Sequence, residues 1–155
     1  MKILIAVDGS EYTTRMLAYI AANDGWLGPQ HQFTVFHCVL ALPHRAAAFI
    51  NEKSVLAFYD DDAETVIKPI REFFKLQAKV ATFRHEIGAP AEHIAKLAML
   101  GKFDLLILGS HGYGAIANVV LGSVATKVLA LCSVGQTFPA WRALQCVRLA
   151  RQFRA

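Results

Sequence analysis

The chain has 155 residues, of which 55% are hydrophobic and 18% charged, so it can fold as one domain with a buried core. This composition excludes an intrinsically disordered protein. The net charge of +4 equals the contribution of the four arginines in residues 134–155, and the rest of the chain is neutral, which argues against a nucleic-acid-binding surface on the body of the protein.

The first predicted strand is formed by residues 3–7, a continuous apolar run that ends at Asp8. Such a run is typical of a strand that is buried on both faces. A helix is expected over residues 13–22, where apolar side chains recur at helical spacing. Ser10 and Thr13 are the two candidates for its N-cap.

The second predicted strand covers residues 33–39, after a stretch rich in turn-forming residues. Residues 40–58 fit either a loop or a short helix. A longer helix is predicted over residues 60–77, because three acidic residues open this stretch and Lys75 lies near its end, as the helix dipole favours. Pro69 is expected to kink this helix or to mark its start.

Two further strands are predicted, over residues 80–87 and 104–108, with a helix between them that starts at Pro90 and runs to about residue 100. A last helix is expected from 123 to about 131. Strands and helices in this alternation predict a single doubly wound α/β fold. We expect an open parallel sheet of about five strands in the order 3-2-1-4-5, with helices on both faces.

A glycine-rich segment follows the strand at 104–108. Gly109 and Gly112 let the backbone turn where a phosphate could approach, and Gly122 and Ser123 open the last helix. A helix N-terminus offers free N–H groups and partial positive charge to an anion. The P-loop pattern and the Rossmann glycine fingerprint are both absent.

The spacing of these residues, G-x2-G-x9-G-S, matches the nucleotide-binding signature of the universal stress protein family. Residues 3–10, 88–94 and 104–112 also resemble segments of that family, in the same order, and the likeness covers residues 1 to about 133. The resemblance implies binding of an adenine nucleotide, with ATP and Mg²⁺ as the expected ligands and AMP or ADP as alternatives. It also implies a binding or signalling protein more than an efficient enzyme.

Carried over by this resemblance, Asp8 lies near the ribose and the metal-bound phosphates and is the implied metal ligand. Cys38 or Val39 frames the adenine, with Ala6 opposite. The glycine segment and the start of the last helix hold the phosphates. The implied nucleotide site consists of Ala6, Asp8, Cys38, Val39, Gly109, His111, Gly112, Gly122, Ser123 and Val124.

The residues themselves leave alternatives open. Asp8 could serve only as a cap of the first helix, and His111 could be solvated in its loop. Ser123 is a reasonable N-cap, and Lys127 either reaches a phosphate or faces solvent. The acids at 60–62 are either a metal cluster or a solvated helix start. Three histidines on separate elements are expected to be structural: His37, His85 and His93.

The likeness to the family ends abruptly, so we divide the chain into a nucleotide-binding domain, residues 1–133, and an atypical basic C-terminal tail, residues 134–155. Family members have a fifth strand at this point, which commonly pairs across a homodimer. Here residues 132–134 begin as expected, but 135–141 then differ. The fifth strand and the homodimer are therefore left open. The tail itself fits either a short amphipathic helix or a frayed terminus.

The function predicted from these observations is that of an adenine-nucleotide-binding regulatory protein of the stress response. One alternative is a slow ATPase, for which Asp8 and His111 are the only obvious helpers, since neither loop contains an arginine. Another is an interaction module that uses no nucleotide. No apolar run reaches the roughly 18 residues of a membrane span, and we expect a cytoplasmic protein. The three widely spaced cysteines predict neither disulfides nor zinc.

Overall fold

The computed structural model describes residues 1–42, 51–109, 122–132 and 135–137, in which strands and helices alternate. The predicted elements are all found, and their bounds differ from expectation by one or two residues except in α3. The elements are β1 (Lys2–Val7), α1 (Glu11–Ala22), β2 (Gln32–Val39), α3 (Glu52–Leu76), β3 (Ala81–Ile87), α4 (Pro90–Leu100), β4 (Leu105–Leu108), α5 (Ser123–Leu131) and β5 (Gly135–Thr137).

The strands form one parallel sheet in the order β3-β2-β1-β4-β5, which confirms the predicted doubly wound α/β fold. From β1 the chain moves outward to β2 and β3, and then returns to place β4 on the other side of β1. The edge of β4 that the sequence left open is paired over three residues, because Gly135–Thr137 lies parallel to it as β5.

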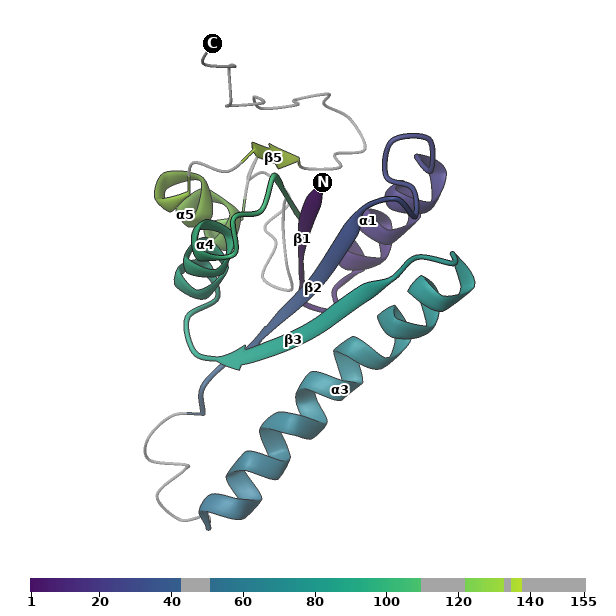
Figure 1. The fold of residues 1–155 in the computed structure, drawn as a ribbon. Helices are drawn as coiled ribbons and strands as arrows, with labels where there is room; N and C mark the ends of the chain where they lie inside the picture. The colour runs from purple at the N-terminus through teal and green to yellow at the C-terminus, as the bar shows by residue number, and fades with distance from the viewer. Residues whose placement is uncertain (43–50, 110–121, 133–134, 138–155) are drawn as a thin grey trace.

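Helices cover both faces of the sheet, with α4 and α5 on one side and α1 and α3 on the other (Figure 1). Successive residues of a strand point to opposite faces. Leu4 and Ala6 of β1 therefore pack toward α4 and α5. Ile3, Ile5 and Val7 pack toward α1 and α3. Because all of these side chains are buried, residues 3–7 of β1 form an unbroken apolar run after the exposed Lys2.

Helix α3 corrects the sequence prediction for residues 60–77. It begins at Glu52 and not at 60, because Asn51 acts as the N-cap and its side chain accepts a hydrogen bond of 2.7 Å from the Lys53 backbone N–H. The alternative that the helix starts near Pro69 is also wrong, since the helix continues through this residue to Leu76.

The added N-terminal turns of α3 are stabilised by packing against the end of β2. Tyr59, Ala63 and Ile67 recur every four residues and form a buried cluster with Val39. The Tyr59 hydroxyl also accepts a hydrogen bond of 2.9 Å from the backbone N–H of Leu42. Tertiary contacts of this kind, more than local propensity, determine where a helix begins.

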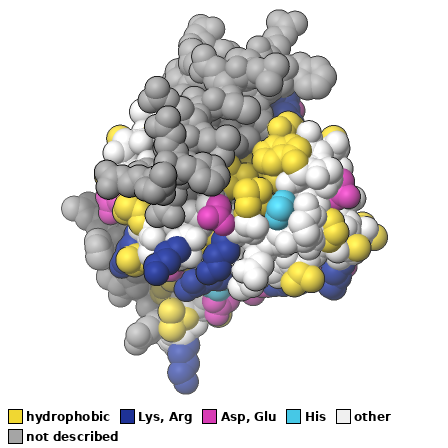
Figure 2. Space-filling model, turned by 45° about the horizontal axis from the view of Figure 1, so that its top comes forward, with side chains coloured by type: hydrophobic (Ala, Val, Ile, Leu, Met, Phe, Trp, Pro, Cys, Tyr) yellow, Lys and Arg dark blue, Asp and Glu magenta, His cyan; other side chains and the backbone are white. Residues whose placement is uncertain are grey.

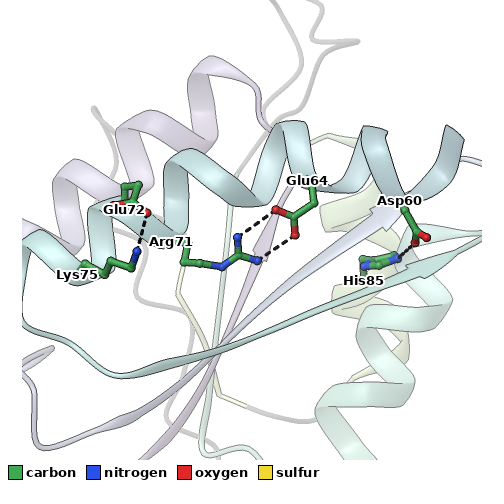
Figure 3. A network of polar contacts seen from close by, with 6 residues as sticks. All are labelled: Asp60, Glu64, Arg71, Glu72, Lys75 and His85. Carbon is green, nitrogen blue, oxygen red and sulfur yellow. Dashed lines mark hydrogen bonds and ion pairs between the residues drawn. The ribbon is translucent and has the colours of Figure 1, made fainter. Parts of the chain in front are cut away.

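The acids at 60–62 are exposed in the middle of α3, so they do not form a helix start. The carboxylate of Asp60 lies 3.3 Å from Nε2 of His85 on β3 (Figure 3). Nearby, Arg71 donates two hydrogen bonds, of 3.0 and 2.9 Å, to Glu64, and these bonds lower the pKa of Glu64. Within the described residues, no three His, Cys, Asp or Glu side chains are grouped to hold a metal ion.

The visible described surface in Figure 2 carries basic and acidic side chains next to one another, with apolar side chains between them. Among the described residues, no helix is both long enough and apolar enough to cross a membrane.

Candidate functional site

The candidate site lies where the strands end at the carboxyl edge of the sheet. The strand order reverses at this edge between β1 and β4, the position at which open α/β sheets bind ligands. Ala6 is in register with Leu108, so Asp8 and Gly109 follow at the same edge. The parallel pairing of β1 with β2 brings Cys38 there as well.

A tight turn fixes Asp8 at the end of β1. Oδ1 of Asp8 accepts hydrogen bonds from the Ser10 N–H (3.0 Å), the Ser10 hydroxyl (2.6 Å) and the Thr13 hydroxyl (2.8 Å). The Thr13 hydroxyl in turn accepts from the N–H groups of Asp8 and Gly9. Gly9 has φ of 79°, a conformation that L side chains disfavour. The turn therefore has a fixed shape before any ligand is bound.

These contacts decide between the predicted caps of the first helix. Ser10 occupies the N-cap position of α1, whereas Thr13 lies inside the helix and is buried. Asp8 precedes the cap, so it organises the turn and does not cap the helix. In the described part of the chain, the hydrogen bonds to the Asp8 carboxylate all involve Oδ1.

The structure separates the two residues expected to frame the adenine. Cys38 and Ala6 share one buried cluster with Leu108, on the side of α4 and α5. The side chain of Val39 packs on the opposite face, and its carbonyl oxygen accepts a hydrogen bond of 2.9 Å from the Gly88 N–H. Ala6 and Cys38 are therefore the pair that faces the same space.

The thiol of Cys38 is expected to react slowly. Burial, and then the charge of Glu86, raise the pKa of Cys38 from 9.0 to about 11. The thiolate at neutral pH is then about a hundredfold scarcer than in an ordinary thiol. We predict that iodoacetamide labels Cys38 far more slowly in the native protein than in urea, as peptide mass spectrometry would measure. Equal rates would contradict the buried, neutral thiol.

The same shift of the pKa affects stability. The unfolded thiol ionises near 9.0, well before the folded one. The contribution of Cys38 to the free energy of unfolding is therefore complete below this pH and is lost as the pH rises toward 11.

Helix α5 presents its N-terminus to this edge without a side-chain cap. Gly122, and not Ser123, is the N-cap, with φ of −67° and ψ of 160°. Its carbonyl oxygen accepts from both the N–H (2.9 Å) and the hydroxyl (3.0 Å) of Thr126. Ser123, Val124 and Lys127 are exposed, so the first turn is open to a ligand.

The remaining predicted residues, His111 and Gly112, lie outside the described residues, and their roles stay predictions. Gly109 is the last residue described before this stretch.

His37, expected from the sequence to be structural, lies at this edge. Its side chain is buried, and Nδ1 lies 2.9 Å from the carbonyl oxygen of Val7. Because a carbonyl can only accept, Nδ1 donates this bond. Nε2 is buried, and no described residue forms a hydrogen bond with it. No local sequence pattern signals this arrangement, because it depends on the pairing of β1 with β2.

Gly88, which follows β3, is bound to the end of β2 through the hydrogen bond from its N–H to the Val39 carbonyl oxygen. Its φ of 142° is strained for any other residue, and an added Cβ would lie 2.7 Å from Nε2 of His93. We predict that Gly88→Ala lowers the free energy of unfolding by about 2 kcal/mol or more, measured by urea denaturation. Gly25→Ala is the matched control, because a Cβ at Gly25 meets nothing within 4 Å. Equal stability of the two variants would contradict this role of Gly88.

Comparison with known proteins identifies the family to which this fold belongs. The model of the universal stress protein family matches residues 1–135. A universal stress protein encoded in the QAH/OAS sulfhydrylase 3'region of Thermus aquaticus is 44% identical over 43 residues. That alignment covers 28% of this chain and 31% of the Thermus protein. The chain therefore matches less than a third of the length of this curated relative.

Solved structures share the fold at low sequence identity. Universal stress protein UspA from Lactobacillus plantarum has a TM-score of 0.73 at 19% identity, over 89% of this chain and 96% of its own. A family member from Arabidopsis thaliana with AMP bound has a TM-score of 0.64 at 9% identity, and the match covers 89% of this chain and 90% of that protein. The universal stress protein from Archaeoglobus fulgidus in complex with dAMP has a TM-score of 0.62 at 16% identity, and the match covers 89% of this chain and 96% of that protein.

Proposed function

Because this chain belongs to the universal stress protein family, we propose that it binds an adenine nucleotide at the carboxyl edge of β1 and β4. The observation that carries the proposal is the convergence of three features at one edge. These are the preformed Asp8 turn, the small side chains of Ala6 and Cys38 on one face, and the uncapped start of α5. The AMP and dAMP complexes of the Arabidopsis and Archaeoglobus proteins support it.

The adenine ring would lie against Ala6 and Cys38. Both are small, and the raised pKa of Cys38 keeps its thiol neutral, so the surface that they offer is apolar. Ligand pockets typically combine such an apolar wall with a few placed polar groups. Val39 would contact the adenine through its backbone and not its side chain, since its side chain packs on the other face of the sheet.

The phosphates would lie between the glycine segment and the start of α5. The N–H groups of Ser123 and Val124 belong to the first turn of this helix, where no side chain caps them. A helix N-terminus stabilises negative charge through these N–H groups and the helix dipole. Gly109, His111 and Gly112 would complete the phosphate site from the other side.

Asp8 would hold Mg²⁺ beside the phosphates. Its Oδ1 already accepts three hydrogen bonds, which leaves Oδ2 to a cation. A carboxylate oxygen fixed by a turn is suitable for Mg²⁺, which is usually bound through one or two carboxylates together with substrate phosphates.

We propose binding and regulation as the role of this site, with ATP as the ligand. Rapid hydrolysis needs charge stabilisation of the transition state, usually from an arginine or lysine, and neither loop of the site contains an arginine. A slow ATPase is the second candidate. Release of phosphate that Asp8→Ala abolishes would favour it.

A thermal-shift panel with ATP, ADP, AMP and GTP, each with and without Mg²⁺, tests the proposal. A ligand at about 100 times its Kd adds roughly 2.7 kcal/mol to the free energy of unfolding, which raises Tm by several degrees. We expect this increase for adenine nucleotides and a smaller one for GTP. An unchanged Tm with every adenine nucleotide would contradict the proposal and favour a module that uses no nucleotide.

A further inference from the structure

A hollow lies between the open side of β3 and helix α4, and it reaches the carboxyl end of β3 at Glu86, which is in register with Cys38. Its volume is about 280 Å³. β3 is an edge strand, and α4 runs back toward the amino ends of the strands and contacts β2, so this face of β3 is left partly uncovered. The hollow is lined by Arg84, Glu86, His93, Lys96, Leu97 and Leu100.

The spacing of these residues explains why they meet. Arg84 and Glu86 are two apart on β3 and therefore point to the same face. On α4, His93, Lys96 and Leu100 recur at intervals of three and four residues, which places them on one side of the helix. Strand and helix thus present their polar side chains to a common space.

The charges in the hollow are unbalanced. His93 Nδ1 donates a hydrogen bond to Glu86, so the one carboxylate of the lining is already engaged. Arg84 and Lys96 have no ion-pair partner among the described residues, whereas Arg71 and Lys75 on α3, on the other face of the sheet, are paired. The two positive charges of Arg84 and Lys96 exceed the single carboxylate charge of Glu86, so the hollow attracts an anion.

We propose that this hollow binds a small organic carboxylate with a short apolar body. The guanidinium of Arg84 can hold a carboxylate through two parallel hydrogen bonds, and Lys96 supplies a second positive charge. Leu97 and Leu100 form an apolar wall, and the exposed side chain of Leu100 would be covered by the apolar body of the ligand. The single charge of a carboxylate suits the site better than a doubly charged phosphate, which would repel Glu86 more strongly.

The test is an NMR titration of the full chain, labelled with ¹⁵N, with hexanoate as the probe. Hexan-1-ol serves as the neutral analogue and inorganic phosphate as the competing anion. We expect hexanoate to shift the amide signals of β3 and α4 in a saturable way. Arg84→Gln and Lys96→Gln should each weaken binding by about tenfold or more, and added salt should weaken it further. Lys53→Gln, which removes an exposed charge outside the hollow, should leave it unchanged.

Several results would overturn the proposal. These are the absence of a saturable shift, equal binding of hexan-1-ol, equal or tighter binding of phosphate, or unchanged affinity in both variants at the hollow. ATP shifts the signals of the Asp8 turn and the start of α5 if the proposed nucleotide site is correct. Failure of one site is thus distinguishable from failure of the other.

Discussion

The Gly122→Glu variant is expected to lose the stabilisation by Mg-ATP that the wild-type protein shows. Gly122 is the N-cap of α5, and its φ of −67° and ψ of 160° are accessible to any residue, so the backbone tolerates the change. A carboxylate at a helix N-terminus is also favourable for the helix itself. The variant should therefore fold, while its charge repels the phosphates from the first turn. The roughly 2.7 kcal/mol gained at about 100 times Kd should disappear.

Thermal shift with Mg-ATP measures this effect. Gly25→Glu is the matched control, because Gly25 lies in the turn after α1 and an added Cβ there meets no atom within 4 Å. It should keep the full increase in Tm. An increase that Gly122→Glu preserves would mean that the nucleotide does not bind at the start of α5.

Substitutions of Asp8 should separate its structural role from its role toward the metal. Asp8→Ala removes the acceptor of three hydrogen bonds, from Ser10 and Thr13. We expect it to lower the free energy of unfolding by about 2 to 3 kcal/mol, since hydrogen bonds to charged groups contribute more than neutral ones. Asp8→Asn keeps an oxygen acceptor at this position and should cost less. Both variants should lose the part of nucleotide binding that depends on Mg²⁺.

Urea denaturation and titration of ATP with and without Mg²⁺ would measure the two effects. Asp62→Asn serves as the control, because Asp62 is an exposed acid in the middle of α3. It should change neither quantity. If Asp8→Asn binds Mg-ATP as tightly as the wild type, Asp8 does not hold the metal and only organises the turn.

The sequence predicted the features of the fold that depend on local pattern. The apolar run of β1 and the proline at the start of α4 both correspond to elements of the structure. The start of α3 was missed, because the cap at Asn51 gives a weak local signal and the first turns are held by contacts with Val39. Acidic residues in the middle of a helix look the same in a sequence as those at its start.

The candidate site was predictable where it depends on a motif. Asp8 and Gly122 are found at the end of β1 and at the start of α5, as the glycine signature and the strand order imply. The separation of Cys38 from Val39 depends on which face of β2 each one occupies. The pairing of Glu86 with His93 depends on the packing of α4 beside β3, and no local pattern encodes it.

Isothermal titration calorimetry of the full chain with ATP, in the presence of Mg²⁺, tests the central claim most directly. We predict a saturable binding reaction with a stoichiometry of about one nucleotide per chain, as expected for the single edge at which the strand order reverses. The same titration with Gly122→Glu should give no binding. The absence of heat with the wild-type protein, together with an unchanged Tm at millimolar ATP, would contradict the claim that this chain binds an adenine nucleotide.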